Sequence, residues 1–376
     1  MARYLLLCLI GIWLVATVSS GLVRHDSKKR DPPANNSPEM TGNVADLSKE
    51  KDKTYTVNGH KVFRYNDVEI DENVVKELFD KGRQRSTSGE TQRQKRAAIV
   101  SDKKKRWPRI ALVPYEIVTA DFNEAQIKDI IATFAFLETE TCIAFREKTN
   151  NDVNYVKIAD CGDGCWAHLG KMDGPNWQKV CLGDGCKWPG LYAHELGHTL
   201  GLQHEHQRPD RDDKIFIHPE NIRNGSEDAF EKFKADSVLT TRYDFASAMH
   251  YERTSFANPG TNTITAKKDW NNEKLGGVWW KMYSYHDVRL LNRAYGCNAF
   301  CKDVECERGY VNKDCKCVTF EEYYATYCKN EYWNDDQCDG WASTGECQKN
   351  PGWMYFRCKK SCKACYNDPK PTKADD

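Results

Sequence analysis

The sequence predicts an α+β domain followed by small disulfide-rich units. Arg109–Tyr115, Asn154–Ala159 and Cys165–Gly170 have the alternation or the short apolar runs of strands. Asn123–Glu140 has apolar residues at helical spacing: Ile127, Ile130, Ile131, Phe134 and Leu137. Another helix is expected near His286–Tyr295. All of the 17 cysteines except Cys8 fall between Cys142 and Cys365, and ten follow Cys297. This crowding predicts a C-terminal disulfide framework, which is typical of secreted proteins.

Length and charge narrow the class of protein. A chain of 376 residues holds one large domain with appendages, or two to three modules. Hydrophobic residues make up 40% of it, which is enough for a packed core. The 55 acidic and 55 basic residues cancel. We therefore expect no nucleic-acid partner and no coating of an anionic membrane.

The first 20 residues have the pattern of a signal peptide. Arg3 precedes an almost wholly apolar run from Leu5 to Val18, and Val18 and Ser20 suit the small positions before a cleavage site. The run is too short for a membrane anchor, and no later segment could span a bilayer. The sequence predicts a secreted, extracellular product without membrane insertion.

Residues 21–96 are polar, charged and free of cysteine, and we interpret them as a propeptide. Within it, Asp71–Lys81 could form a short amphipathic helix. The segment ends in the basic run Arg93–Arg96, which is either a solvated patch or the site of a proprotein convertase. Its place between a flexible segment and core-like sequence favours cleavage after Arg96. The mature chain would then begin at Ala97.

The most informative stretch is His194–His204. His194 and His198 are four residues apart, on one face of a helix and within reach of a single zinc ion, and Glu195 between them can act as a general base. In an unbroken helix His204 would lie about 15 Å along the axis from His194, too far to share that ion. The helix must therefore stop, and Gly201 lies where a left-handed residue is needed.

After a domain of about 200 residues that ends at Cys297, two small units follow. The first spans residues 298–318 and the second residues 328–365. Both are too short to fold on apolar burial alone, so we expect disulfides to hold them. The tail, 366–376, is expected to be disordered.

Residues 97–297 resemble the astacin family of the metzincins. The zinc signature carries the resemblance, together with a glutamate directly after the third histidine. Further matches are Thr141–Phe145, Gly164–Trp166, His204–Asp212, Ser247–Tyr251 and Asn292–Cys297. The resemblance implies a two-lobed domain, with a twisted sheet under the zinc helix and an irregular lower lobe.

The family also implies a role for each site residue. His194, His198 and His204 would bind one zinc ion per subunit, with water completing the site. Tyr251 would be a further ligand that swings away during turnover and stabilises the oxyanion. Met249 would be an apolar floor beneath the metal, and His250 a support residue. Zinc lowers the pKa of bound water towards about 7, and Glu195 would take its proton and pass it to the leaving amine.

Two expectations concern activation. In astacins the glutamate that corresponds to Glu205 meets the new N-terminal amino group, here that of Ala97; on its own it could be a surface carboxylate. Family propeptides place an aspartate on the zinc. The segment Phe63–Val68 departs from the family pattern, with an Asn in place of a Gly and a longer spacing. Asp67 is the candidate zymogen ligand, and the alternative is a linker residue.

The resemblance implies the pairs Cys142–Cys297 and Cys165–Cys186. Cys161 and Cys181 flank the same two segments, and we expect them to form a second rung. Cys301, Cys306, Cys315 and Cys317 resemble a truncated EGF-like segment, whose pairing stays open. The last six cysteines resemble an ShK-toxin-like module with Gly340–Trp341, and the implied pairs are Cys328–Cys365, Cys338–Cys358 and Cys347–Cys362. Free toxins use a Lys-Tyr dyad, but here Met354 precedes Tyr355, so we expect a scaffold or docking role.

Asn224 and Asn35 lie in glycosylation acceptor sequences. Together these features predict a zinc metalloendopeptidase that acts on extracellular proteins or peptides, with a proprotein convertase as activating partner. The alternative is a binding or matrix protein that acts through its six-cysteine module. Loops within Asn258–Met282 are expected to shape the primed side of the cleft. The sequence identifies neither the physiological substrate nor the oligomeric state.

Overall fold

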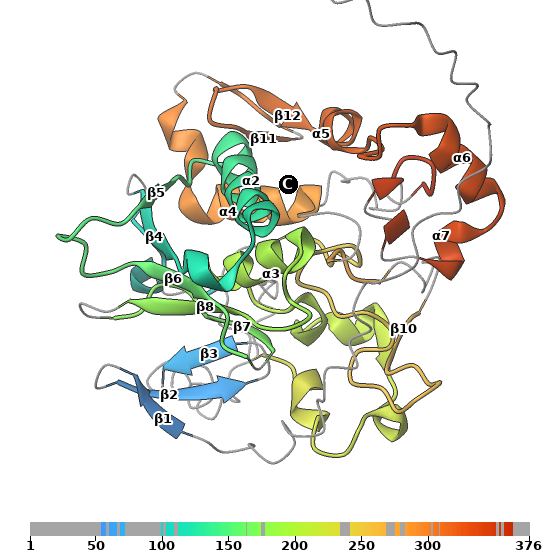
Figure 1. Ribbon diagram of the computed structural model, residues 1–376, viewed down its shortest axis with the longest axis horizontal. Helices are drawn as coiled ribbons and strands as arrows, with labels where there is room; N and C mark the ends of the chain where they lie inside the picture. Colours follow the sequence, from blue (N-terminus) through green and yellow to red (C-terminus); the bar gives the residue numbers. More distant parts are fainter. Residues whose placement is uncertain are drawn as a thin grey trace, which may run out of the picture. The chain divides into compact units, whose positions relative to one another are not determined.

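A mixed eight-stranded sheet is the largest element of the fold, in the order β1-β2-β3-β7-β8-β6-β4-β5 (Figure 1). Its strands are β1 (Thr54–Val57), β2 (His60–Tyr65), β3 (Val68–Asp71), β4 (Val113–Ile117), β5 (Phe145–Glu147), β6 (Val156–Ala159), β7 (Cys165–His168) and β8 (Gln178–Leu182). The strands β4, β5, β6 and β8 are parallel, whereas β7 is antiparallel to β8. With the helices below, this sheet confirms the predicted α+β class.

The computed structural model describes residues 54–57, 60–65, 68–71, 99–100, 103–108, 112–162, 164–173, 177–233, 241–267, 275–278, 283–301, 304–307, 309–350, 353–354 and 357–363. They all belong to one compact unit, Ala34–Asp376. Among them, no helix has the length and apolar character needed to cross a membrane.

Three strands lie in the segment interpreted as a propeptide. The strands β1, β2 and β3 are antiparallel to one another, and β3 adds to the edge of the sheet parallel to β7. Val68 lies opposite Ala167, and Glu69 lies opposite His168. No strand was expected here, and of the predicted amphipathic helix only Asp71 is described, as the last residue of β3.

The long predicted helix is confirmed as α2 (Glu124–Glu140). It begins at a capping box in which the Asn123 side chain accepts from the Gln126 backbone, and the Gln126 side chain accepts from the Asn123 backbone. Three of the five apolar positions that we expected to pack are buried. Ile127 is partly buried and Ile131 is 39% exposed, whereas Phe136, which was not among the five, is buried.

Strand boundaries were less predictable. The strand expected at Arg109–Tyr115 is found as β4, shifted towards the C-terminus, and Leu112 is exposed. The strands β5 and β8 were not anticipated, because three residues of β5 and the lysine-containing β8 give little alternation to detect. Parallel strands covered on both faces need not alternate.

The chain after α3 (Pro189–Thr199), the helix that bears His194 and His198, is irregular, as the resemblance implies. It consists of the short 3-10 turns η5 (Glu205–Gln207), η6 (Arg211–Asp213), η7 (Pro219–Asn221) and η8 (Glu227–Phe230), with the strand pair β9 (Ile215–Ile217) and β10 (Ile264–Ala266). A separate apolar cluster includes Ile222, Phe230 and Leu275. The helix α4 (Tyr285–Tyr295) then returns to the main core and ends at Gly296, whose φ is +63°.

The segment after Cys297 packs against the main domain. The strands β11 (Gly309–Val311) and β12 (Cys317–Thr319) form a hairpin that leads into α5 (Phe320–Tyr327). The disulfides are Cys301–Cys315 and Cys306–Cys317. The expected disulfides are present, and in addition the aromatic residues of this segment join the core of the main domain. In Figure 1 the hairpin and α5 lie above α2 and α4.

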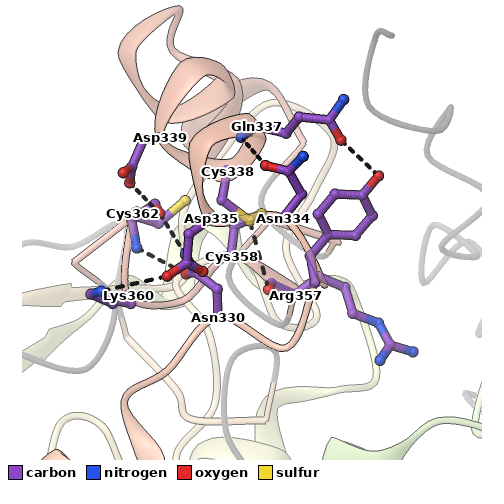
Figure 2. The surroundings of a disulfide bond; sticks show 12 residues. Asn330, Asn334, Asp335, Gln337, Cys338, Asp339, Arg357, Cys358, Lys360 and Cys362 are labelled. Carbon is purple, nitrogen blue, oxygen red and sulfur yellow. Dashed lines mark hydrogen bonds and ion pairs between the residues drawn. A yellow bond between two sulfur atoms is a disulfide. The ribbon is translucent and has the colours of Figure 1, made fainter. Parts of the chain in front are cut away.

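The six-cysteine unit differs, because it has an apolar core of its own. This core includes Trp341 and Met354 beside the disulfides Cys338–Cys358 and Cys347–Cys362. Its helices are α6 (Asp335–Ser343) and α7 (Glu346–Lys349). Figure 2 shows Asn334, which caps α6 by accepting from the Gln337 backbone. Cys365, the expected partner of Cys328, lies outside the described residues.

Candidate metal centre

The helix α3 begins at Pro189 and ends at Thr199, just before Gly201, as the sequence predicts. Gly201 has a φ of +94°, the left-handed conformation that ends helices. A Cβ atom at this position would lie 2.7 Å from Cγ2 of Val100, so glycine is needed for space as well as for conformation. The turn brings His204 back towards the two histidines of the helix.

The three histidines converge and are all buried. One ligand atom from each of His194, His198 and His204 lies within 4.8 Å of the other two. The Nε2 atoms of His198 and His204 are 3.2 Å apart. Two nitrogens bound to one tetrahedral zinc at about 2.0–2.1 Å lie about 3.3 Å apart. The residues present therefore fit a zinc ion.

The other ring nitrogen of each histidine faces an oxygen that can only accept. The Nδ1 atoms of His194 and His198 lie 2.6 Å and 2.8 Å from the carbonyl oxygens of Ala248 and Leu202. Nδ1 of His204 lies 2.9 Å from Oε1 of Gln207. Each Nδ1 therefore carries the proton, and each Nε2 is left as a ligand atom. Such outer partners fix the orientation and tautomer of metal-binding histidines.

The loop beneath the helix is held from α4. A Cβ atom at Gly197 would lie 2.8 Å from the Met249 sulfur, so Met249 packs directly against the zinc helix. The carboxylate of Asp287 accepts from the Ser247 hydroxyl at 2.6 Å and from the Ala248 backbone at 2.8 Å. This contact orients the same loop whose carbonyl binds His194. Glu195, the predicted base, is fully buried beside the histidines on α3.

Tyr251 lies between the metal-binding histidines and a further ring. Its ring centroid is 4.7 Å from that of His204 and 3.9 Å from that of His206, on which it stacks. Burial lowers the pKa of His206 well below its usual range, so this ring is neutral. Burial lowers the pKa of His250 to about 4, and its Nδ1 donates to the Tyr251 carbonyl, so its Nε2 accepts from the Tyr243 hydroxyl at 2.7 Å. Its contacts suit a support residue.

Glu205 is the centre of a buried charge network. One of its oxygens accepts from Nη1 of Arg208 at 2.7 Å and from the Asp244 backbone at 2.8 Å. Arg208 also donates to both carboxylate oxygens of Asp210. Burial raises the pKa of Glu205 to about 8, and the positive charge of Arg208 opposes that shift.

The expected partner of Glu205, Ala97, lies outside the described residues, as do Arg96, Asp67 and Asn35. The nearby Ile99 is fully buried and bridges to Leu202, at the turn before His204. Asn224 lies in the described turn between η7 and η8. The domain contains the disulfides Cys142–Cys297, Cys161–Cys181 and Cys165–Cys186, with Cα atoms 5.2 to 5.6 Å apart.

Sequence reasoning missed two residues that organise the site. Arg208 was part of a matched segment but received no role, and Asp287 received none either. The signal available for Asp287 is local: Ser284 and Asp287 form the capping box of α4. Nothing in the local sequence points to the contact between Asp287 and a loop some forty residues earlier.

Three imidazoles with a nearby carboxylate form a donor set that suits zinc better than magnesium or calcium, which prefer oxygen ligands. Such a site can bind a carbonyl or water and move a proton.

Comparisons with known proteins match this arrangement. The family model for the Astacin peptidases matches residues 99–296. Zinc metalloproteinase nas-15 of Caenorhabditis elegans is 32% identical over 313 residues, which cover 77% of this chain and 51% of that protein. Protein SpAN of Strongylocentrotus purpuratus is 32% identical over 63% of this chain and 39% of its own length. The chain thus spans about half or less of these curated relatives.

Among solved structures, high choriolytic enzyme 1, a hatching enzyme zinc-protease from the medaka fish Oryzias latipes, matches with a TM-score of 0.44 and 26% identity. The match covers 57% of this chain and all of that one.

Proposed function

The chain belongs to the astacin family, and on that premise we propose that it is a secreted zinc endopeptidase made as a zymogen. The observation that carries the proposal is the convergence of three buried histidine ligand atoms beside the buried Glu195. Their outer hydrogen bonds leave the Nε2 atoms as ligands. Protein or peptide substrates are the partners that this chemistry requires.

Each residue of the site has a role in peptide hydrolysis. A zinc ion held by the histidines would lower the pKa of bound water and polarise the substrate carbonyl. Glu195 takes the proton of the attacking water and then delivers it to the leaving amine. Tyr251, placed between His204 and His206, donates a hydrogen bond from its hydroxyl to the developing oxyanion. Met249 supports the helix that presents the first two ligands.

Latency rests on the propeptide. The strand β3 pairs with the edge strand β7, so this edge cannot pair with a substrate strand at the same time. Asp67 immediately precedes Val68, the residue opposite Ala167, and is proposed to block the zinc. A proprotein convertase would cut after Arg96, and the new amino group of Ala97 would join the buried Glu205.

Secretion and domain limits complete the proposal. Seven disulfides join described cysteines, which requires an oxidising compartment. We propose a signal peptide over 1–20, a propeptide over 21–96, a peptidase domain over 97–297, an EGF-like segment over 298–318 and an ShK-toxin-like module over 328–365. Asn224, and Asn35 in the propeptide, would carry glycans.

The deciding experiment compares the processed wild-type protein with Glu195→Gln on a library of peptides. We expect zinc-dependent cleavage by the wild type and a fall in kcat of roughly 10²–10⁴-fold in the variant, because general acid–base catalysis contributes about that much. Zinc content should be equal in both. Equal cleavage by the two proteins would contradict the proposal. A biological effect that persists in Glu195→Gln would favour the binding function of the six-cysteine module.

A further inference from the structure

The hairpin β11–β12 and the helix α5 share one core with the zinc helix. Phe320, Tyr323 and Tyr324 of α5 are buried in the same apolar cluster as Leu196 and Leu200 of α3. The hairpin adds Tyr310 and Val318 to it. This segment therefore belongs physically to the peptidase unit, although the family match ends at residue 296.

A relay of two buried tyrosines runs from α5 to the zinc helix. The Tyr323 hydroxyl donates to the carbonyl oxygen of Tyr283 at 2.8 Å. The Tyr283 hydroxyl in turn donates to the carbonyl oxygen of Ala193 at 2.6 Å. Ala193 directly precedes His194 and Glu195. A hydroxyl that is bonded to this carbonyl restrains the turn of α3 that bears the first zinc ligand and the proton acceptor.

A second support of His194 comes from the residues that follow Tyr283. Tyr283 is followed by Ser284, which caps α4, and by Asp287, which binds Ser247 and Ala248. The Ala248 carbonyl faces Nδ1 of His194. Residues 283–287 thus hold His194 both through the helix backbone and through its ring. Tyr323 of α5 donates to the carbonyl oxygen of Tyr283, the first of these residues.

The segment is anchored independently of the zinc helix. The hydroxyls of Tyr310 and Tyr327 both donate to the carboxylate of Glu140, the last residue of α2. The Glu140 carbonyl accepts from the Asn292 side chain of α4 at 2.8 Å. Tyr327 also packs on Phe136 of α2, with ring centroids 5.0 Å apart. Because this anchor lies on α2 and α4, α5 can serve as a fixed reference for Tyr283.

We propose that α5 positions the metal centre through Tyr323 and Tyr283, which act as positioning residues for His194 and Glu195. This inference rests on the zinc site proposed above. The hydrogen bonds of the relay join α5, Tyr283 and α3, and the six-cysteine unit has a separate core. A chain cut at the end of the family match would lose this support.

The test uses the full chain, with Tyr283→Phe, Tyr323→Phe and the control Tyr310→Phe. Each variant loses one hydroxyl from a buried aromatic ring, but only the first two belong to the relay. Zinc affinity is measured by competition with a chelator, site geometry by the visible spectrum of the cobalt-substituted protein, and stability by urea unfolding of the metal-free protein.

We expect Tyr283→Phe to weaken zinc binding by about 10–100-fold, as other losses of outer support do, and to alter the cobalt spectrum. Tyr323→Phe should act in the same direction by roughly 3–10-fold, the value of one hydrogen bond. Tyr310→Phe should lower the urea midpoint and leave zinc affinity and spectrum unchanged, because Tyr327 still holds the segment on Glu140 and Phe136.

Wild-type zinc affinity and spectrum in both relay variants would overturn the inference, and so would a cobalt spectrum that changes equally in Tyr310→Phe. If Tyr283→Phe does not fold, Tyr323→Phe decides alone. A wild-type protein that binds no zinc would instead contradict the proposed function.

Discussion

The two cysteine-rich segments at the C-terminal end look alike in sequence but differ in what holds them. The segment Cys301–Tyr327 has two disulfides, yet its buried tyrosines and Phe320 join the core of the peptidase domain. The unit around Cys338–Cys362 also has two described disulfides, but its apolar residues form a separate core. Cysteine density therefore does not tell an autonomous module from an extension of its neighbour.

The polar contacts of the two segments show the same difference. Tyr310 and Tyr327 place their hydroxyls on the buried carboxylate of Glu140 in another part of the chain. In the six-cysteine unit, the polar contacts in Figure 2 stay within the unit: Asn330 donates to Asp335 and to Ser361, and Lys360 pairs with Asp335. We infer that long-range aromatic and polar contacts, rather than disulfides, decide where the folding unit ends.

The largest expected effect comes from shortening the chain at its C-terminal end. A protein that ends at Asn298 loses the burial of Tyr310, Phe320, Tyr323 and Tyr324. At about 1.5–3 kcal/mol for each buried side chain, this loss is comparable to the whole net stability of a domain, about 5–15 kcal/mol. We expect this protein not to fold. A protein that ends at Tyr327 should fold and bind zinc.

Circular dichroism and zinc content of the two truncated proteins measure this difference. Equal melting temperatures for both would show that the segment is as independent as its cysteines suggested.

The second prediction concerns the six-cysteine unit alone. Its small core cannot replace a lost cross-link, so Cys338→Ser with Cys358→Ser should cost about 2–5 kcal/mol and unfold the unit. Limited proteolysis should then cut within residues 330–363, while cleavage of short peptides by the activated protein stays within about twofold of the wild type. As a matched control, Cys301→Ser with Cys315→Ser should leave the segment protected by its core contacts. Equal proteolysis of both would remove the distinction between the segments.

The comparison also shows what a sequence can predict here. The helix of residues 124–140, the stop at Gly201 and the convergence of three histidines follow from periodicity and local backbone preferences, which nearby residues encode. The roles of Asp287 and Tyr323 do not, because their partners lie forty residues away, and Tyr310 meets Glu140 across 170 residues. The sequence around a polar side chain does not show which distant group that side chain will contact. Only the folded structure reveals such contacts.

The third prediction tests the anchor of the fused segment. Glu140→Ala would leave the hydroxyls of the buried Tyr310 and the half-buried Tyr327 without their acceptor, at a cost of about 2–4 kcal/mol in the free energy of unfolding. Urea unfolding measures the loss. Asp335→Asn in the six-cysteine unit is the control: its ion pair with Lys360 is more than half exposed on both sides and should contribute at most about 1 kcal/mol. A smaller loss in Glu140→Ala than in the control would mean that the anchor does not hold the segment.

The smallest expected effect is a pH dependence that belongs to the buried region. Burial, and then the charge of Asp244, raises the pKa of Asp287 to about 6, whereas an unfolded aspartate has a pKa of about 3.9. Between these values the folded protein binds more protons than the unfolded chain. The contribution of Asp287 to stability is therefore full below about pH 4 and is lost as the pH rises through about 6.

Asp287→Asn cannot lose a proton, so it should remove this contribution to the pH dependence. We expect the free energy of unfolding of the wild type, relative to that of the variant, to fall by roughly 1–3 kcal/mol between pH 4 and pH 7. Asp335→Asn, in the half-exposed ion pair of the six-cysteine unit, should keep the wild-type slope. If Asp287→Asn kept that slope as well, the pH dependence would have to come from other buried groups. The carboxylate that holds the loop at Ser247 would then be ionised throughout this range, and its place in the core would rest on its hydrogen bonds to Ser247, Ala248 and Ser284.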